Sequence, residues 1–130
     1  MKQIVRFLPV ILYSAMIFYL SAQSQPMSPD LGFEMQDKVY HCGAYFIYGM
    51  LLIIALSSKF DLANSKRLMI YVLGIGGLFA LSDEVHQYFV PGRSAEVWDW
   101  LADVVGLYIS VWLVQYNLKK FTKGNGTPNE

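Results

Sequence analysis

Long apolar runs separated by short polar segments dominate the chain. The runs cover about residues 5–22, 39–56, 68–88 and 97–116. Each is close to the roughly 20 residues that an α-helix needs to cross about 30 Å of hydrocarbon. In the third run only Leu68 to Leu81 is uninterrupted, which is too short, so its helix is predicted to continue through Asp83 and Glu84. The pattern predicts an all-α, polytopic membrane protein with four transmembrane helices.

The first run has a second interpretation. Lys2 and Arg6 precede a short apolar stretch that ends in SAQSQ, a pattern also found in secretory signal peptides. The cleavage pattern is poor, because Leu20 is the third residue before a cut after Ala22, where a small residue is expected. We therefore expect one four-helix membrane domain over residues 1–118, followed by a polar tail at 119–130 that is predicted to be disordered.

Composition agrees with a membrane protein, since 55% of the residues are hydrophobic and 15% are aromatic. The formal net charge is +0, and the lysines fall in short interhelical segments instead of a basic stripe, which argues against a nucleic-acid partner. The single cysteine, Cys42, excludes an intramolecular disulfide and is interpreted as an apolar packing residue.

Positive charge is distributed asymmetrically about the predicted helices. Lys38 and Arg93 fall on one side of the membrane, and the other cationic residues fall on the opposite side. Because lysine and arginine are enriched in cytoplasmic segments, both termini are predicted to be cytoplasmic, with the connections at 23–38 and 89–96 outside. The cytoplasmic set comprises Lys2, Arg6, Lys59, Lys66, Arg67, Lys119, Lys120 and Lys123.

Polar residues from three helices are predicted to meet at the outer end of the bundle. Most of them lie three or four residues from the next one in the same helix and therefore share a face, as Asp83 and Gln87 do. An unpaired charge in hydrocarbon costs on the order of 3 kcal/mol, so these groups are expected to face the bundle interior and to pair. Lys38 and Arg93 are the only cations on this side that can balance the acids, so Arg93, in the tight PGR connection, is expected to fold over the cluster. The residues are Lys38, His41 and Tyr45, then Asp83, Glu84 and Gln87, then Asp99 and Asp103.

The side-chain types in this constellation suggest acid–base chemistry on a bound ligand. A structural network that ties the helices together is the plain alternative. Metal binding by His41 with nearby carboxylates is a further alternative, but no H-E-x-x-H-like spacing supports it, so no metal and no cofactor are assigned. The candidate catalytic residues are His41, Asp83, Glu84 and Asp103. The candidate substrate-binding residues are Lys38, Tyr45, Gln87, Arg93 and Asp99.

The segments DKVYHCGAYFIYG and LSDEVHQYFVPGRSAEVWDWLADVVG resemble the VanZ-like family of small bacterial membrane proteins. The resemblance runs from about Tyr19 to Val111 and rests on three ordered blocks, D-K-x-x-H-x-x-x-Y, D-E-x-x-Q and P-G-R-[ST]-x-x-x-x-D. It implies four membrane helices, a bacterial plasma membrane location and, through the best-known member, a link to low-level resistance to the glycopeptide teicoplanin. Asp103 departs from the family, where asparagine is expected. The resemblance carries onto this chain Asp37, Lys38, His41, Tyr45, Asp83, Glu84, Gln87, Arg93, Asp99 and Asp103.

Three functions follow as hypotheses. The first is an enzyme or enzyme-like site that acts on a lipid-linked envelope molecule, with Lys38 and Arg93 on an anionic headgroup and the PGR connection as a clamp. The second is a non-catalytic module that binds an envelope lipid or a partner protein. A proton-coupled transporter is disfavoured, because the inner halves of the helices lack ionisable groups. The lipid bilayer is the expected environment, and the sequence specifies no oligomeric state.

Overall fold

The structure is a computed structural model of the chain, and it describes residues 2–24, 32–59, 61–62 and 64–124. Its helices are α1 (Lys2–Ser21), α2 (Gln36–Leu56), α3 (Ser65–Tyr88) and α4 (Val97–Gly124). These described residues contain no strand. All four helices are long and apolar enough to cross a membrane, which confirms the predicted all-α fold with four membrane-spanning helices.

Helix α4 is longer than the sequence pattern predicted. It continues to Gly124, past the domain boundary predicted at residue 118. Leu118, Lys119 and Lys120 are good helix formers, so the end of the apolar run does not end the helix. The polar segment that was predicted to be disordered therefore begins as helix, and residues 125–130 lie outside the described part of the chain.

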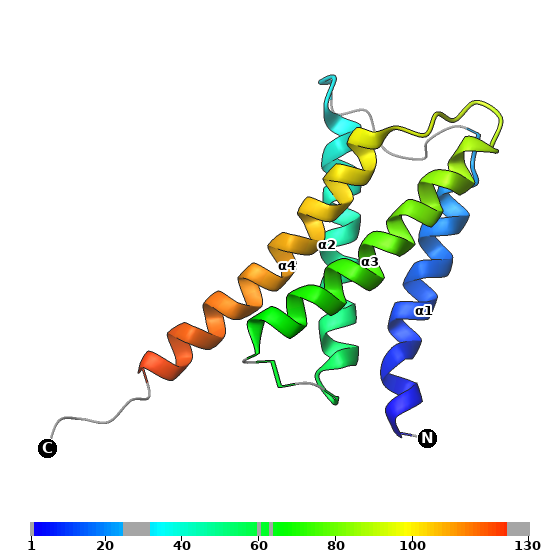
Figure 1. Cartoon of the computed structure of the whole chain (residues 1–130). Coiled ribbons are helices and arrows are strands. Elements are labelled where there is room, and N and C mark those ends of the chain that lie inside the picture. The colour runs from blue at the N-terminus through cyan, green and yellow to red at the C-terminus, as the bar shows by residue number, and fades with distance from the viewer. Residues whose placement is uncertain (1, 25–31, 60, 63, 125–130) are drawn as a thin grey trace, which may run out of the picture.

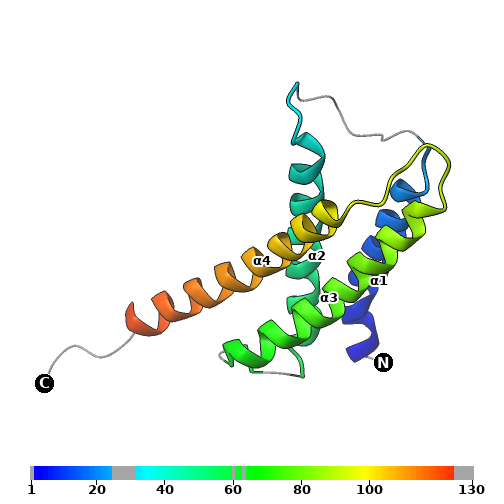
Figure 2. The same ribbon diagram turned by 45° about the horizontal axis from the view of Figure 1, so that its top comes forward.

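The helices run alternately up and down, so the connections lie at two opposite ends of the bundle (Figure 1). Helix α2 packs most extensively against α4, and α3 also packs against α4. Helix α1 contacts α2 and α3 but, within the described residues, not α4. The start of α2, the end of α3 and the start of α4 lie at one end, which is called the polar end below (Figures 1 and 2).

The outer surface of the bundle is apolar. Between 17% and 39% of each membrane-spanning window is buried inside the structure, so most of its apolar side chains face outward. Soluble proteins rarely expose apolar patches of that extent, whereas a bilayer solvates them. A smaller apolar core lies between the helices and includes Tyr45, Leu52, Leu68, Val72, Leu107 and Val111.

Gly106 allows α2 and α4 to approach closely. A Cβ atom at Gly106 would lie 2.8 Å from the backbone nitrogen of Phe46, closer than real side chains come. Small residues permit such close crossings of membrane helices. Asp103 precedes Gly106 by about one turn of α4, so this contact sets the distance between α2 and α4 next to the polar end.

Candidate functional site

Buried polar side chains are concentrated at the polar end of the bundle. Five side chains there are each at most 5% exposed: Asp83, Glu84 and Gln87 on α3, and Asp99 and Asp103 on α4. Side chains at such a depth in an otherwise apolar structure need partners, and most of them have partners here. The group is called the polar cluster below and consists of Ser21, Lys38, His41, Tyr45, Asp83, Glu84, Gln87, Asp99 and Asp103.

His41 and Asp103 join α2 to α4. Nδ1 of His41 and Oδ1 of Asp103 are 2.9 Å apart, and Asp103 has no exposed surface. The second carboxylate oxygen of Asp103, Oδ2, has no hydrogen-bond partner among the described residues. An imidazole and a carboxylate in direct contact can exchange a proton. Oδ2 of Asp103 is available to a ligand in addition.

Asp83 is held from two helices. Oγ of Ser21, at the end of α1, donates a hydrogen bond of 2.6 Å to Oδ1 of Asp83. Nε2 of Gln87, one turn further along α3, donates to Oδ2 at 3.2 Å. The same amide accepts a hydrogen bond of 2.8 Å from Nη2 of Arg93 at its Oε1. Arg93 is therefore linked to Asp83 through Gln87.

Gly92 shapes the connection that carries Arg93. Its φ of +82° lies in the left-handed region that favours glycine, and an added Cβ atom would meet the carbonyl oxygen of Ser24 at 3.0 Å. The backbone N–H of Arg93 donates to the carbonyl of Val90 at 3.1 Å and closes the turn. The turn brings the guanidinium back to the end of α3, next to Gln87.

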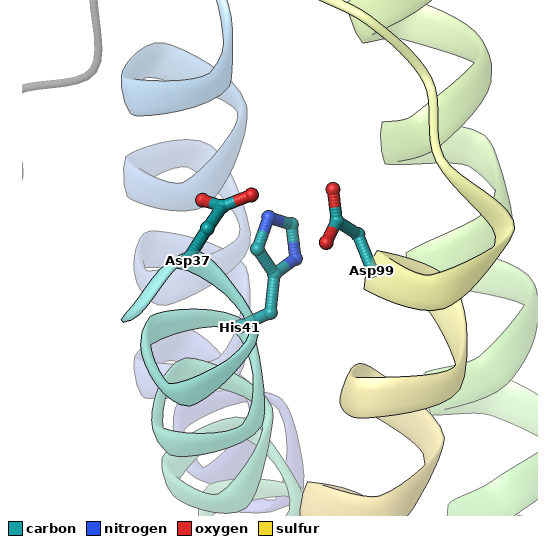
Figure 3. A group of neighbouring side chains, drawn as sticks. All are labelled: Asp37, His41 and Asp99. Atoms are coloured by element: carbon teal, nitrogen blue, oxygen red, sulfur yellow. The ribbon is translucent and has the colours of Figure 1, made fainter. Parts of the chain in front are cut away.

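Lys38 forms ion pairs with three acids near the start of α4. Its ammonium group contacts Asp99 directly and lies 2.7 Å from Oε2 of Glu96 and 3.6 Å from Oδ2 of Asp37. These four residues are called the Lys38 network below. The hydrogen bond from Lys38 lowers the pKa of the Glu96 carboxyl below its ordinary value, because it stabilises the ionised form. Figure 3 shows the His41 ring between Asp37 and Asp99, beside this network.

Glu84 connects the polar cluster to an apolar groove. Its Oε2 accepts a hydrogen bond of 3.0 Å from the backbone N–H of Glu96, whereas its Oε1 is buried without a partner among the described residues. The groove has a volume of about 350 Å³ and lies between the end of α3 and the start of α4. Its walls are Leu81, Val85, Tyr88, Phe89, Ala95, Val97 and Trp100, together with Glu84 and Glu96.

The structure brings the predicted site residues together, with one difference in their pairing. Arg93 was expected to balance the buried acids, but it forms no ion pair within the described residues and donates instead to the neutral amide of Gln87. The PGR turn holds Arg93 on the α3 side, while Lys38 projects from α2 towards Asp99 on α4 and balances the charge there. The other predicted residues lie in the polar cluster: Lys38, His41, Tyr45, Asp83, Glu84, Gln87, Asp99 and Asp103.

Sequence reasoning missed two residues that contact the cluster. Ser21 is 4% exposed and bonded to Asp83, but a single serine at the end of an apolar run carries no pattern. Glu96 precedes α4 and binds Lys38. Eight of the ten acidic residues lie at or beyond the predicted outer boundary of the membrane, and this excess was the one signal that could have found Glu96.

Two groups of side chains have the ligand types and the spacing to hold a metal ion. One comprises Asp37, His41 and Asp99, and the other comprises His41, Glu84 and Asp103. In each group, one nitrogen or oxygen atom per residue lies within 4.8 Å of the others. The two groups share the His41 side chain, so they are alternatives for that ligand.

Comparison with known proteins identifies the family. No curated protein and no solved structure matches the chain. A family model described as VanZ/LLP1 matches residues 4–119, a range that contains the whole polar cluster and nearly all of the four helices. As its three sequence blocks predicted, the chain belongs to the VanZ/LLP1 family of membrane proteins.

Proposed function

We propose that the protein binds a lipid-linked molecule of the bacterial cell envelope at the outer leaflet of the plasma membrane and acts on its headgroup. The observation that carries this proposal is the position of Glu84, which belongs to the polar cluster and also to the wall of the apolar groove. A ligand with a polar headgroup and a hydrocarbon tail matches two such adjoining surfaces.

The distribution of positive charge supports the orientation. Lys59, Lys66 and Arg67 lie at the end of the bundle opposite the polar cluster, where α2 ends and α3 begins (Figure 1). Because lysine and arginine are enriched in cytoplasmic segments, this excess supports a cytoplasmic position for that end. In this orientation both termini are cytoplasmic and the polar cluster faces the outer leaflet.

Arg93 is the proposed contact to a headgroup phosphate or carboxylate. A guanidinium group carries five N–H donors in a planar fork that suits such anions. Nη2 of Arg93 donates to Gln87, and no other side-chain partner of Arg93 occurs in the described part of the chain. The remaining donors can therefore bind a ligand. Lys38 is already engaged by three carboxylates, so its first role in this proposal is to hold the cluster together.

His41, Asp83, Glu84 and Asp103 are the proposed acid–base groups. Their support is the direct contact between His41 and Asp103 and the unpartnered oxygens of Glu84 and Asp103, which can receive a proton from a bound ligand. A link to teicoplanin resistance belongs to the same proposal, because a changed envelope precursor changes what a glycopeptide meets at the cell surface. A non-catalytic module that binds a lipid or a protein is the second candidate, favoured by the dense structural pairing around Lys38.

Lipids that copurify with the protein in native-membrane discs test the binding step. We expect an anionic lipid to be enriched over the surrounding membrane, and Arg93→Ala to lower that enrichment by at least about tenfold, because a charge-assisted hydrogen bond contributes about 1.5–3 kcal/mol. Arg67→Ala is the matched control, since Arg67 lies at the opposite end of α3. Equal lipid composition in the wild-type discs and the bulk membrane would reject a lipid ligand and favour a protein partner.

Asp83→Asn separates an enzyme from a binder, because Asp83 is a proposed acid–base group that does not line the apolar groove. The substitution keeps the shape of the side chain but removes its ability to accept a proton. A catalytic site should still copurify with its lipid but lose its effect on the teicoplanin susceptibility of the cells. If the lipid and the effect on susceptibility are lost in the same proportion, the non-catalytic candidate is the correct one.

A further inference from the structure

The acids at the polar end of the bundle differ in their partners. Asp83 accepts hydrogen bonds from Ser21 and Gln87, and the other acids form two sets. Asp37, Glu96 and Asp99 surround the ammonium group of Lys38. Glu84 and Asp103 form no ion pair with a lysine or arginine within the described residues, and His41 is the basic group beside them. The carboxylates of this second set are also buried, whereas the side chains of Asp37 and Glu96 are each 45% exposed to solvent. Within the described residues, the second set therefore has neither a lysine or arginine partner nor free access to water.

Unused hydrogen-bonding capacity marks the same second set. Oε1 of Glu84 and Oδ2 of Asp103 are both buried without a partner among the described residues. The two side chains are 5% and 0% exposed, so bulk water does not solvate these atoms freely. A buried carboxylate oxygen without a partner costs roughly 1–3 kcal/mol or more, and a ligand that supplies positive charge would remove that cost.

We infer that His41, Glu84 and Asp103 form a binding site for a divalent metal ion of the Zn²⁺ or Mn²⁺ class. One ligand atom from each of the three residues lies within 4.8 Å of the others, so small inward movements bring all three to a common ion. Imidazole ligands suit Zn²⁺ and related transition-metal ions, whereas carboxylate ligands suit Mn²⁺ and Mg²⁺. A set of one imidazole nitrogen and two carboxylate oxygens therefore suits Zn²⁺ or Mn²⁺. Three protein ligands leave coordination positions open for water or substrate.

The alternative group of Asp37, His41 and Asp99 is a poorer site for a cation. Lys38 contacts both of its carboxylates, and an ammonium group in that position repels a second positive charge. Figure 3 shows that the imidazole ring lies between these two acids, but both acids already have a counter-ion. Because Lys38 lies beside Asp37 and Asp99, we assign the metal ion to the group of His41, Glu84 and Asp103.

A bound ion would also explain how an acidic cluster can accept an anionic headgroup, a consequence that rests on the proposed function. Glu84 lies in the wall of the apolar groove, so an ion on Glu84 would stand where the groove meets the polar cluster. Carboxylates alone repel a phosphate, whereas a divalent ion between them attracts it and polarises its oxygens.

Mn²⁺ titration of the purified full-length protein in detergent, after removal of metal with a chelator, tests the inference by electron paramagnetic resonance. We expect one bound ion per chain, with hyperfine coupling to a nitrogen nucleus from His41. Glu84→Gln should weaken binding at least tenfold, because it removes a charged ligand. Glu96→Gln makes the same chemical change in the Lys38 network and should bind Mn²⁺ like the wild type.

The wild-type measurement does not depend on whether a variant folds. Absence of bound Mn²⁺, or bound Mn²⁺ without nitrogen coupling, would overturn the site. So would wild-type affinity in folded Glu84→Gln, or an equal loss in Glu96→Gln. If an anionic lipid copurifies but Mn²⁺ does not bind, the metal site is wrong and the proposed function stands. If Mn²⁺ binds but no anionic lipid is enriched, the lipid ligand is wrong and the metal site stands.

Discussion

Lys38 is the side chain on which the pairing of the polar cluster depends most. Its ammonium group meets three carboxylates, and Asp99, the partner it contacts directly, is 3% exposed. Lys38→Met removes the charge and keeps most of the apolar stem. We expect a loss of about 3 kcal/mol in the free energy of unfolding, because breaking a buried ion pair leaves the remaining charge unbalanced. Thermal unfolding in detergent measures the change.

Two further variants separate this electrostatic effect from lost packing. Lys66→Met makes the same change at an exposed position of α3 and should leave the unfolding temperature unaltered. Asp99→Asn in the Lys38→Met background removes the carboxylate that has lost its ion-pair partner, and it should therefore recover part of the stability. Equal destabilisation in the single and the double variant would mean that charge balance is not the reason.

The sequence predicts which side chains enter the polar cluster better than it predicts how they pair. His41, Tyr45, Asp99 and Asp103 follow helical spacing, and the cost of charge in hydrocarbon turns that face inward. Pairing depends instead on the rotation of each helix and on the turn at Gly92, neither of which leaves a periodic signal. For that reason Arg93 was expected to fold over the acids and balance them together with Lys38, whereas in the structure Lys38 pairs with acids and Arg93 donates to Gln87.

Packing of α2 on α4 controls the distance between the two helices that carry His41 and Asp103. Gly106→Ala places a methyl group against the backbone of Cys42 and Phe46, which cannot move aside as a flexible side chain can. We expect a net destabilisation of about 1–3 kcal/mol, because overpacking outweighs the helix propensity gained. Separation of the helices should also weaken Mn²⁺ binding, since Asp103 lies about one turn from Gly106.

Gly74→Ala is the matched control for this packing contact. A Cβ atom at Gly74 of α3 would meet nothing within 4 Å, so the change should be neutral or should stabilise by up to about 1 kcal/mol. Both variants are compared by thermal unfolding in the same detergent. A Gly106→Ala protein as stable as Gly74→Ala would show that the close crossing of α2 and α4 is not needed.

The bundle as a whole follows from hydropathy, since four apolar runs predicted four membrane helices with nearly the observed starts and ends. The end of α4 was harder to predict, because residues 117–124 are mostly polar and their helix depends on intrinsic helix propensity. The groove beside Glu84 was not predicted, because it arises from the angle between the end of α3 and the start of α4. Such angles are set by three-dimensional packing, which a single hydropathy profile does not contain.

The proposed function requires that the polar end of the bundle face the outside of the cell. Single cysteines at Ser94, in the connection that carries Arg93, and at Ser65, at the start of α3, occupy exposed positions at opposite ends of the bundle. With Cys42→Ala in both proteins, a membrane-impermeant maleimide should label Ser94→Cys in intact cells and Ser65→Cys only after the membrane is opened. Labelling of Ser65→Cys but not of Ser94→Cys in intact cells would contradict the account.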